Sequence, residues 1–157
     1  MITIDKEPRA LALVHALKES GLRITPQRIW VCQELCRRED HPTAQQIHAT
    51  LHSQYPSLSL TTVYQTLDRL VALGVITSIG RIGDEAEHYD AQNGPHGHIV
   101  CRTCQRIRDY FSPAIAEVER DLSSQCPGPL DGGRIMYFTS CLEHKTPEQC
   151  PWSRNET

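Results

Sequence analysis

The periodicity of apolar residues changes once along this chain, at Asn93-Gly94-Pro95, and that change constrains the fold more than any other feature. Before this break, apolar residues recur at helical spacing in segments separated by glycine or proline. After it, short alternating runs are typical of strands. We therefore predict an α+β chain with two domains, residues 1–91 and 92–157.

Each helical segment of the first domain carries its own start and stop signals. Polar residues or prolines stand at the starts, and glycine or proline stands near the ends. In the first helix, Leu11, Val14 and Leu17 are predicted to face the core. The expected helices run from Pro8 to Ser20, from Pro26 to about Arg38, from Ala44 to before Pro56, and from a cap at Ser57 or Ser59 to Gly74. The last two, joined by a short polar turn, predict a helix-turn-helix.

A predicted hairpin completes the first domain. Val75 to Arg81 alternates, Gly83-Asp84 can turn, and Glu87 to Asp90 can return, so this hairpin would form a wing. The second domain is predicted to contain strands and one helix, and the tail after Pro151 is predicted to be disordered. These strands are expected at His98 to Arg102, Arg106 to Phe111 and Arg134 to Ser140, with the helix from Ser112-Pro113 to about Cys126.

The cysteine content points to metal binding or packing. No apolar stretch approaches the roughly 20 residues that span a bilayer, and no signal core is present, so we expect a cytoplasmic protein without membrane contact. The chain has seven cysteines, an odd number, and a reducing compartment keeps thiols free. Both facts argue against a disulfide framework. Cys32, Cys36 and Cys126 are assigned to packing.

Cys101-Arg102-Thr103-Cys104 lies between two predicted strands and can supply half of a tetrahedral zinc site. Cys141 with His144 or Cys150 could complete it, as Cys₃His or Cys₄. A bare structural knuckle is the alternative. Thioredoxin-like redox chemistry is disfavoured because no βαβ pattern surrounds the motif.

A second set of potential ligands consists of Asp90, His96, His98 and Asp109. Two histidines in a His-x-His pattern on a strand would point to one face, and mixed histidine and carboxylate ligation suits Fe²⁺, Mn²⁺ or Zn²⁺. The alternatives are a solvated histidine-rich loop and a metallohydrolase centre, which would need an open coordination site and a general base in a pocket.

The segment Leu60 to Leu70 is the candidate recognition helix. Its first turns present Thr61, Thr62, Tyr64 and Gln65, which can contact phosphates and base edges in a major groove. The net charge of −3 gives no general support for nucleic-acid binding. Binding to DNA would therefore depend on a few arginines and polar side chains at specific positions. The further candidates are Arg23, Thr25, Gln27, Arg28 and Arg81. An ordinary amphipathic helix, or a zinc-stapled module that binds protein, remains the alternative.

Four motifs in this order and spacing resemble the ferric uptake regulator (Fur) family of repressors, over roughly residues 10 to 142. They are Leu22-Arg23-Ile24-Thr25-Pro26-Gln27-Arg28, His41-Pro42-Thr43-Ala44, Thr61-Thr62-Val63-Tyr64 and His96-x-His98-x-x-Cys101-x-x-Cys104. The resemblance implies a homodimeric, metal-dependent repressor of double-stranded operator DNA. It also implies a structural Zn²⁺ on the cysteines and a regulatory Fe²⁺ or Mn²⁺ between the domains.

The same resemblance adds His41 to the regulatory ligands, which would then be His41, Asp90, His96, His98 and Asp109. An aspartate at 109 is typical of the peroxide-sensing PerR branch, whereas glutamate is usual in iron sensors. The resemblance to this branch implies that Fe²⁺ bound at the site would react with H₂O₂ and oxidise His41 or His96, after which the protein would release DNA. Bound Mn²⁺ would maintain repression without reacting. An iron- or zinc-responsive uptake regulator is the alternative.

Two departures from the family pattern concern single positions. His144 stands where a second cysteine is common after Cys141, which leaves the fourth zinc ligand open between His144 and Cys150. Gln65 stands where an arginine or lysine is frequent, and this change is expected to weaken phosphate contact or alter operator preference.

Overall fold

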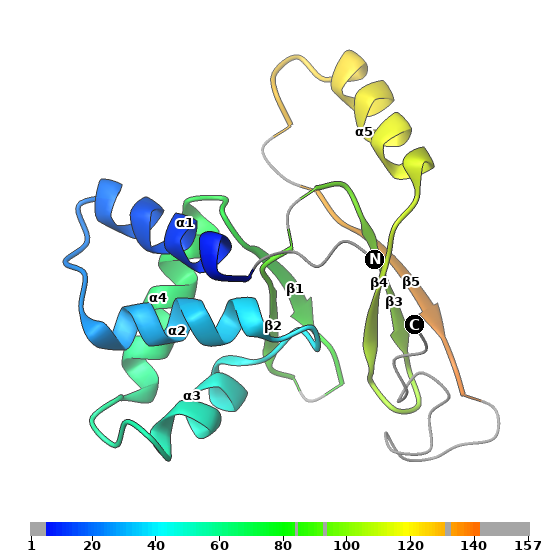
Figure 1. The fold of residues 1–157 in the computed structure, drawn as a ribbon. Helices are drawn as coiled ribbons and strands as arrows, with labels where there is room; N and C mark the ends of the chain where they lie inside the picture. The colour runs from blue at the N-terminus through cyan, green and yellow to red at the C-terminus, as the bar shows by residue number, and fades with distance from the viewer. Residues whose placement is uncertain (1–5, 84, 93, 131–132, 142–157) are drawn as a thin grey trace. The chain divides into compact units, whose positions relative to one another are not determined.

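The computed structural model describes residues 6–83, 85–92, 94–130 and 133–141. The chain divides into two compact units, Met1–Gln92 and Asn93–Thr157. Helices and a hairpin make up the first unit, and a small sheet with one helix makes up the second (Figure 1). The predicted α+β class, with a winged helix-turn-helix followed by a small α/β unit, is confirmed.

Local sequence signals set the starts of the helices in the first unit. Thr25, Thr43 and Ser59 are N-caps whose side chains accept hydrogen bonds from the backbone N–H three residues on. Thr43 and Gln46 form a complete capping box. The four helices are α1 (Lys6–Glu19), α2 (Pro26–Arg37), α3 (Ala44–His52) and α4 (Leu60–Ala72). Of the two predicted caps for α4, the structure therefore selects Ser59.

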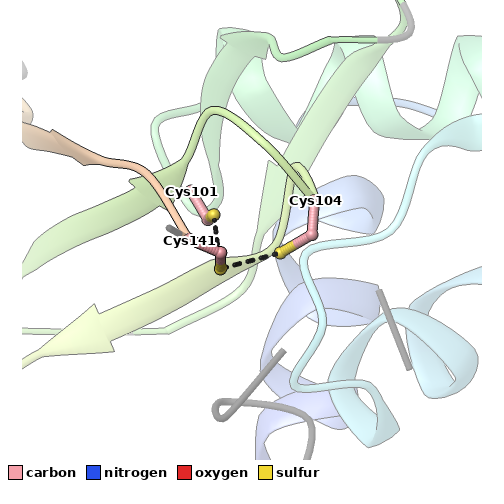
Figure 2. Close-up of side chains that lie close together, drawn as sticks. All are labelled: Cys101, Cys104 and Cys141. Carbon is pink, nitrogen blue, oxygen red and sulfur yellow. Dashed lines mark hydrogen bonds between the residues drawn. The ribbon is translucent and has the colours of Figure 1, made fainter. Parts of the chain in front are cut away.

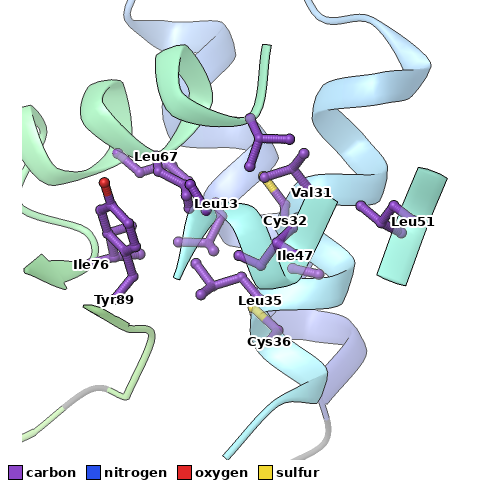
Figure 3. Packing of buried hydrophobic residues seen from close by; sticks show 14 of the residues in the cluster. Leu13, Val31, Cys32, Leu35, Cys36, Ile47, Leu51, Leu67, Ile76 and Tyr89 are labelled. Carbon is purple, nitrogen blue, oxygen red and sulfur yellow. The ribbon is translucent and has the colours of Figure 1, made fainter. Parts of the chain in front are cut away.

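The core of the first unit lies where the four helices meet the hairpin (Figure 3). Leu17, Val31, Ile47 and Leu67 are all 0% exposed there. The predicted inward face of α1 is partly wrong, because Leu11 is 67% exposed. The buried residues of α1 are Ala10, Leu13 and Leu17. Both sets follow helical spacing and share Leu17, so periodicity alone does not separate them.

The wing is an antiparallel hairpin of β1 (Thr77–Arg81) and β2 (Glu87–Asp90), with an irregularity between Ser78 and Gly80. Of the predicted turn, Asp84 lies outside the described residues. The segment before α3 runs along the outer side of β2. Thr43 pairs with His88 as an isolated antiparallel bridge, and the Tyr89 N–H donates to the Pro42 carbonyl over 3.1 Å. The chain before α3 is thereby fixed to the wing.

The second unit contains a three-stranded sheet in the order β4-β3-β5, with β3 (Gly97–Cys101) in the centre. It pairs antiparallel with β4 (Ile107–Tyr110) and parallel with β5 (Ile135–Thr139). Helix α5 (Pro113–Gln125) joins β4 to the last part of the chain, and Ser112 caps it. The predicted disordered tail after Pro151 lies outside the described residues.

No helix in the described part of the chain is both long and apolar enough to cross a membrane. Of the cysteines assigned to packing, Cys32 and Cys36 are buried, as predicted. The prediction is wrong for Cys126, which is exposed just after the end of α5. That helix buries only Ile115, so its C-terminal turn has nothing to pack against within the described residues.

Candidate metal centres

Three cysteines meet at one end of the sheet in the second unit (Figure 2). Cys101 ends β3, Cys104 lies in the turn before β4, and Cys141 follows β5. The Cys141 sulfur lies 3.1 Å from that of Cys101 and 4.0 Å from that of Cys104. Three strand ends therefore bring together residues that are 40 positions apart in the chain.

The electrostatics of this cluster favour a thiolate. Burial raises the pKa of the Cys101 thiol, but hydrogen bonds from the backbone of Cys104 and Thr103 and from the Cys141 thiol outweigh burial. Together they lower that pKa to about 6. Thiolates at about 2.3 Å from a tetrahedral ion would lie roughly 3.8 Å apart, so the observed spacing fits one such ion. His144 and Cys150, the two candidates for a fourth ligand, lie outside the described residues.

The second unit also gathers His96, His98 and Asp109. The Nε2 atoms of the two histidines are 3.2 Å apart. Asp109 Oδ1 lies 3.5 Å from His98 Nε2 and 3.8 Å from His96 Nε2. His98 faces Asp109 across the β3–β4 ladder, where the two residues are paired in register. Nitrogen and oxygen donors are thus already within the distances that one ion would bridge.

His96 was predicted to lie on the strand, but it precedes the first residue of β3 by one position. Neighbouring groups nevertheless orient its ring. Its Nδ1 lies 2.9 Å from the Gly94 carbonyl, which can only accept, so Nδ1 carries a hydrogen, and in the neutral ring Nε2 keeps its lone pair. Metal-binding histidines commonly donate their second ring N–H in this way. The ring also stacks on Phe111, with centroids 5.4 Å apart.

In the first unit, His41 and Asp90 are close to each other. Their ligand atoms lie within 4.8 Å, and both residues are buried, with exposed fractions of 4% and 3%. Asp90 ends β2 and accepts a hydrogen bond from the Gln92 N–H over 2.7 Å. His41 lies in the segment that runs along β2. Each unit therefore brings its own predicted ligands together.

The residues predicted to bind DNA all belong to the first unit. Thr61 and Gln65 are exposed in the first turns of α4, Tyr64 is half-buried, and the Thr62 hydroxyl lies 2.9 Å from that of the cap Ser59. Arg81 and Arg23 are exposed, and Gln27 is half-buried. The Arg28 guanidinium donates to the Arg23 carbonyl, and Thr25 caps α2. The structural contacts of Thr62 and Arg28 were not predicted from the sequence, whereas the cap at Thr25 was.

His88 was not predicted to have any role. It is buried on β2, and its Nδ1 lies 2.7 Å from the carbonyl of His41. The signal that would have identified it is a contact between segments 47 positions apart, which no local pattern contains.

Comparison with known proteins places this geometry in a family. The model of the "Ferric uptake regulator family" matches residues 19–126. The peroxide-responsive repressor PerR of Staphylococcus aureus is 33% identical over 130 residues, which are 83% of this chain and 87% of that protein.

Solved structures give the same result for the fold. The peroxide stress regulator of Campylobacter jejuni is 29% identical, has a TM-score of 0.63 and covers 84% of this chain and 98% of its own. The ferric uptake regulator Fur of Helicobacter pylori is 23% identical, has a TM-score of 0.68 and covers 88% of this chain and 92% of its own. This chain therefore belongs to the ferric uptake regulator family and is a metal-responsive transcriptional regulator, not an enzyme.

Proposed function

We propose that this protein is a dimeric repressor of operator DNA that senses hydrogen peroxide through a metal-bound histidine. The observation that carries the proposal is the cluster of His96, His98 and Asp109, whose donor atoms lie 3.2 to 3.8 Å apart. Such a shell of imidazoles and a carboxylate suits Fe²⁺ and Mn²⁺. The similarity to a peroxide-responsive repressor over most of the chain supports the peroxide reading.

We assign five ligands to the regulatory metal: His41, Asp90, His96, His98 and Asp109. When bound as Fe²⁺, the metal would supply the reaction of H₂O₂ that adds one oxygen to a ligand histidine and releases water. The residues around the site orient the ligand atoms. The Gly94 carbonyl holds the His96 ring so that Nε2 faces His98, and Asp109 offers a carboxylate beside both rings.

Loss of one ligand histidine would weaken the hold of the remaining ligands, so metal occupancy would fall. Oxidation at His41 or His96 would therefore lower DNA affinity. As a regulator of promoters, the protein is assigned to the cytoplasm.

We assign the Cys101, Cys104 and Cys141 cluster to a structural Zn²⁺, with His144 or Cys150 as the fourth ligand. Its thiol spacing and the lowered pKa of Cys101, about 6, support this assignment, since zinc binds the thiolate form. The ion would hold the ends of three strands at one point and so stabilise the second unit.

We assign operator contacts to the α4 residues Thr61, Thr62, Tyr64 and Gln65, together with Arg23, Thr25, Gln27, Arg28 and Arg81. The helix N-terminus favours a phosphate near the first turn, and exposed Thr61 and Gln65 offer hydrogen bonds to base edges. A second copy of the chain is expected to cover the exposed apolar side chains of the second unit.

The test uses an operator fragment selected from a random-sequence pool with Mn²⁺-loaded protein. Fluorescence anisotropy then compares the wild type, His98→Ala and the control His15→Ala, whose ring is exposed on α1. The wild type and the control should bind DNA only with Mn²⁺, and His98→Ala should require at least about tenfold more Mn²⁺. DNA binding that ignores Mn²⁺ in all three proteins would contradict a metal-dependent repressor.

A further inference from the structure

The backbone of His41 is in an unusual conformation, with φ of +52°. Residues with a Cβ rarely adopt this left-handed region, because it is sterically strained for them. His41 is also buried, with 4% of its surface exposed. Surrounding contacts must therefore hold the residue in place.

Those contacts come from β2. His88 Nδ1 lies 2.7 Å from the His41 carbonyl oxygen, and because a carbonyl only accepts, Nδ1 carries the hydrogen. The next two residues are held by the same strand: the Pro42 carbonyl accepts from the Tyr89 N–H, and Thr43 pairs with His88. The His88 side chain acts directly on the backbone of the ligand residue.

The other side of His41 is fixed as well. The Arg38 guanidinium donates to both carboxylate oxygens of Asp40 over 2.8 and 2.5 Å, and to the Thr50 hydroxyl over 3.3 Å. The residue before His41 is thus tied to α2 and α3. His88 completes the restraint from the side of the wing.

This arrangement links two proposed metal ligands through one strand. Asp90 lies two residues after His88 on β2, and its ligand atom is within 4.8 Å of that of His41. The strand that carries one ligand therefore also fixes the backbone of the other. A centre built this way requires little rearrangement when the metal binds, which raises affinity.

We propose that His88 is a positioning residue of the regulatory metal centre: its Nδ1–H, bonded to the His41 carbonyl, sets the backbone conformation that directs His41 toward Asp90. The proposal rests on the proposed function, in which His41 and Asp90 are ligands. His88 acts through this hydrogen bond and is not itself assigned as a ligand.

The chemistry of the bond suggests matched substitutions. The side-chain amide nitrogen of asparagine stands about where Nδ1 of histidine does, so His88→Asn retains a donor for the His41 carbonyl. Leucine has similar bulk but no donor, so His88→Leu removes the bond and leaves a buried carbonyl without it. In glutamine the amide lies one carbon further out, so His88→Gln keeps polarity but misplaces the donor.

The experiment measures Mn²⁺ affinity of the zinc-loaded, full-length protein by electron paramagnetic resonance of free Mn²⁺, which does not depend on DNA binding. His88→Leu and His88→Gln should bind Mn²⁺ about tenfold more weakly than the wild type. His88→Asn and the exposed control His15→Leu should stay near the wild-type affinity. Circular dichroism establishes that each variant is folded, and His88→Gln replaces His88→Leu if the latter is not.

Wild-type affinity in both His88→Leu and His88→Gln would overturn the role of His88 while leaving the regulatory centre intact. Equal weakening in His88→Asn and His88→Gln would also overturn it, because the position of the donor would then not matter. A wild-type chain that binds no Mn²⁺ would instead refute the regulatory centre and this proposal together.

Discussion

Burial separates the cysteines of this chain into groups with different chemistry. Cys32 and Cys36 lie in the core of the first unit, where burial raises the pKa of both thiols, that of Cys32 to about 12. Cys101 has its pKa lowered to about 6 within the cluster of the second unit. Cys126 is exposed and belongs to neither group.

We expect a thiol-alkylating reagent at pH 8 to modify Cys126 before Cys32 and Cys36 in the folded, zinc-loaded protein. A thiol reacts as the thiolate, and a raised pKa keeps Cys32 and Cys36 protonated until the pH approaches that pKa. Peptide mapping by mass spectrometry gives the order of modification. Early labelling of Cys32 in folded protein would contradict the buried environment.

Cys104→Ser should remove the structural Zn²⁺, because oxygen replaces one of its sulfur ligands. Released zinc, measured with a chromophoric chelator, should fall from about one ion per chain to near zero. Thermal unfolding should show a less stable second unit, because Cys101 and Cys104 are buried there with Cys141 packed against them. Cys126→Ser is the control and should keep its zinc; loss of zinc in both would place the ion elsewhere.

At single residues, the meeting of three thiols was predicted from their chemistry, whereas the exposure of Cys126 was not predicted. Cys101, Cys104 and Cys141 were expected together because thiols at strand ends suit one ion, and the sulfurs do meet. Cys126 was assigned to packing on residue type alone, and it is exposed. His41 entered the ligand set only through family resemblance, because a lone histidine has no local pattern.

Helix ends followed from sequence more reliably than helix faces did. Thr25-Pro26, Thr43 and Ser112-Pro113 cap helices as expected, because a cap depends on residues within one turn. The face of α1 depends on where the other helices lie, so Leu11 was expected inside and Leu13 is buried instead. The role of His88 likewise depends on β2 lying beside the chain before α3.

Ser59 provides a test of the helix-turn-helix at its most local point. Its Oγ accepts from the Thr62 N–H over 3.1 Å at the start of α4. Ser59→Ala should lower the free energy of unfolding of the first unit by about 1 kcal/mol and weaken operator binding, because the first turn of α4 would fray. Urea denaturation measures the stability. Ser57→Ala is the control, since Ser57 is exposed and is not the cap; an equal effect of both would contradict the assignment of Ser59.

At the scale of the whole molecule, the proposed dimer is supported by the second unit, whose described residues leave several large apolar side chains exposed. Phe111, Tyr137 and Phe138 are 61%, 60% and 53% exposed. Val118 and Leu122 of α5 are also exposed. Large exposed apolar side chains grouped in one small unit are typical of an interface.

Tyr137→Glu should therefore convert the dimer to a monomer, because a carboxylate would be buried at the interface without a partner. Sedimentation velocity measures the change, and operator affinity should fall with it. Leu11→Glu is a matched control, since Leu11 is 67% exposed on α1 of the other unit, and it should remain dimeric. A dimeric Tyr137→Glu protein would mean that β5 is not part of the interface.

The central claim is that this chain is a metal-dependent repressor that senses peroxide. The most direct measurement is operator binding by anaerobic protein loaded with Fe²⁺ or with Mn²⁺, before and after a low dose of H₂O₂, with the intact mass read on each sample. We expect only the Fe²⁺ form to lose DNA and to gain one oxygen, located at His41 or His96. If both forms ignore peroxide while DNA binding follows the metal concentration, the protein regulates metal uptake and the peroxide account is wrong.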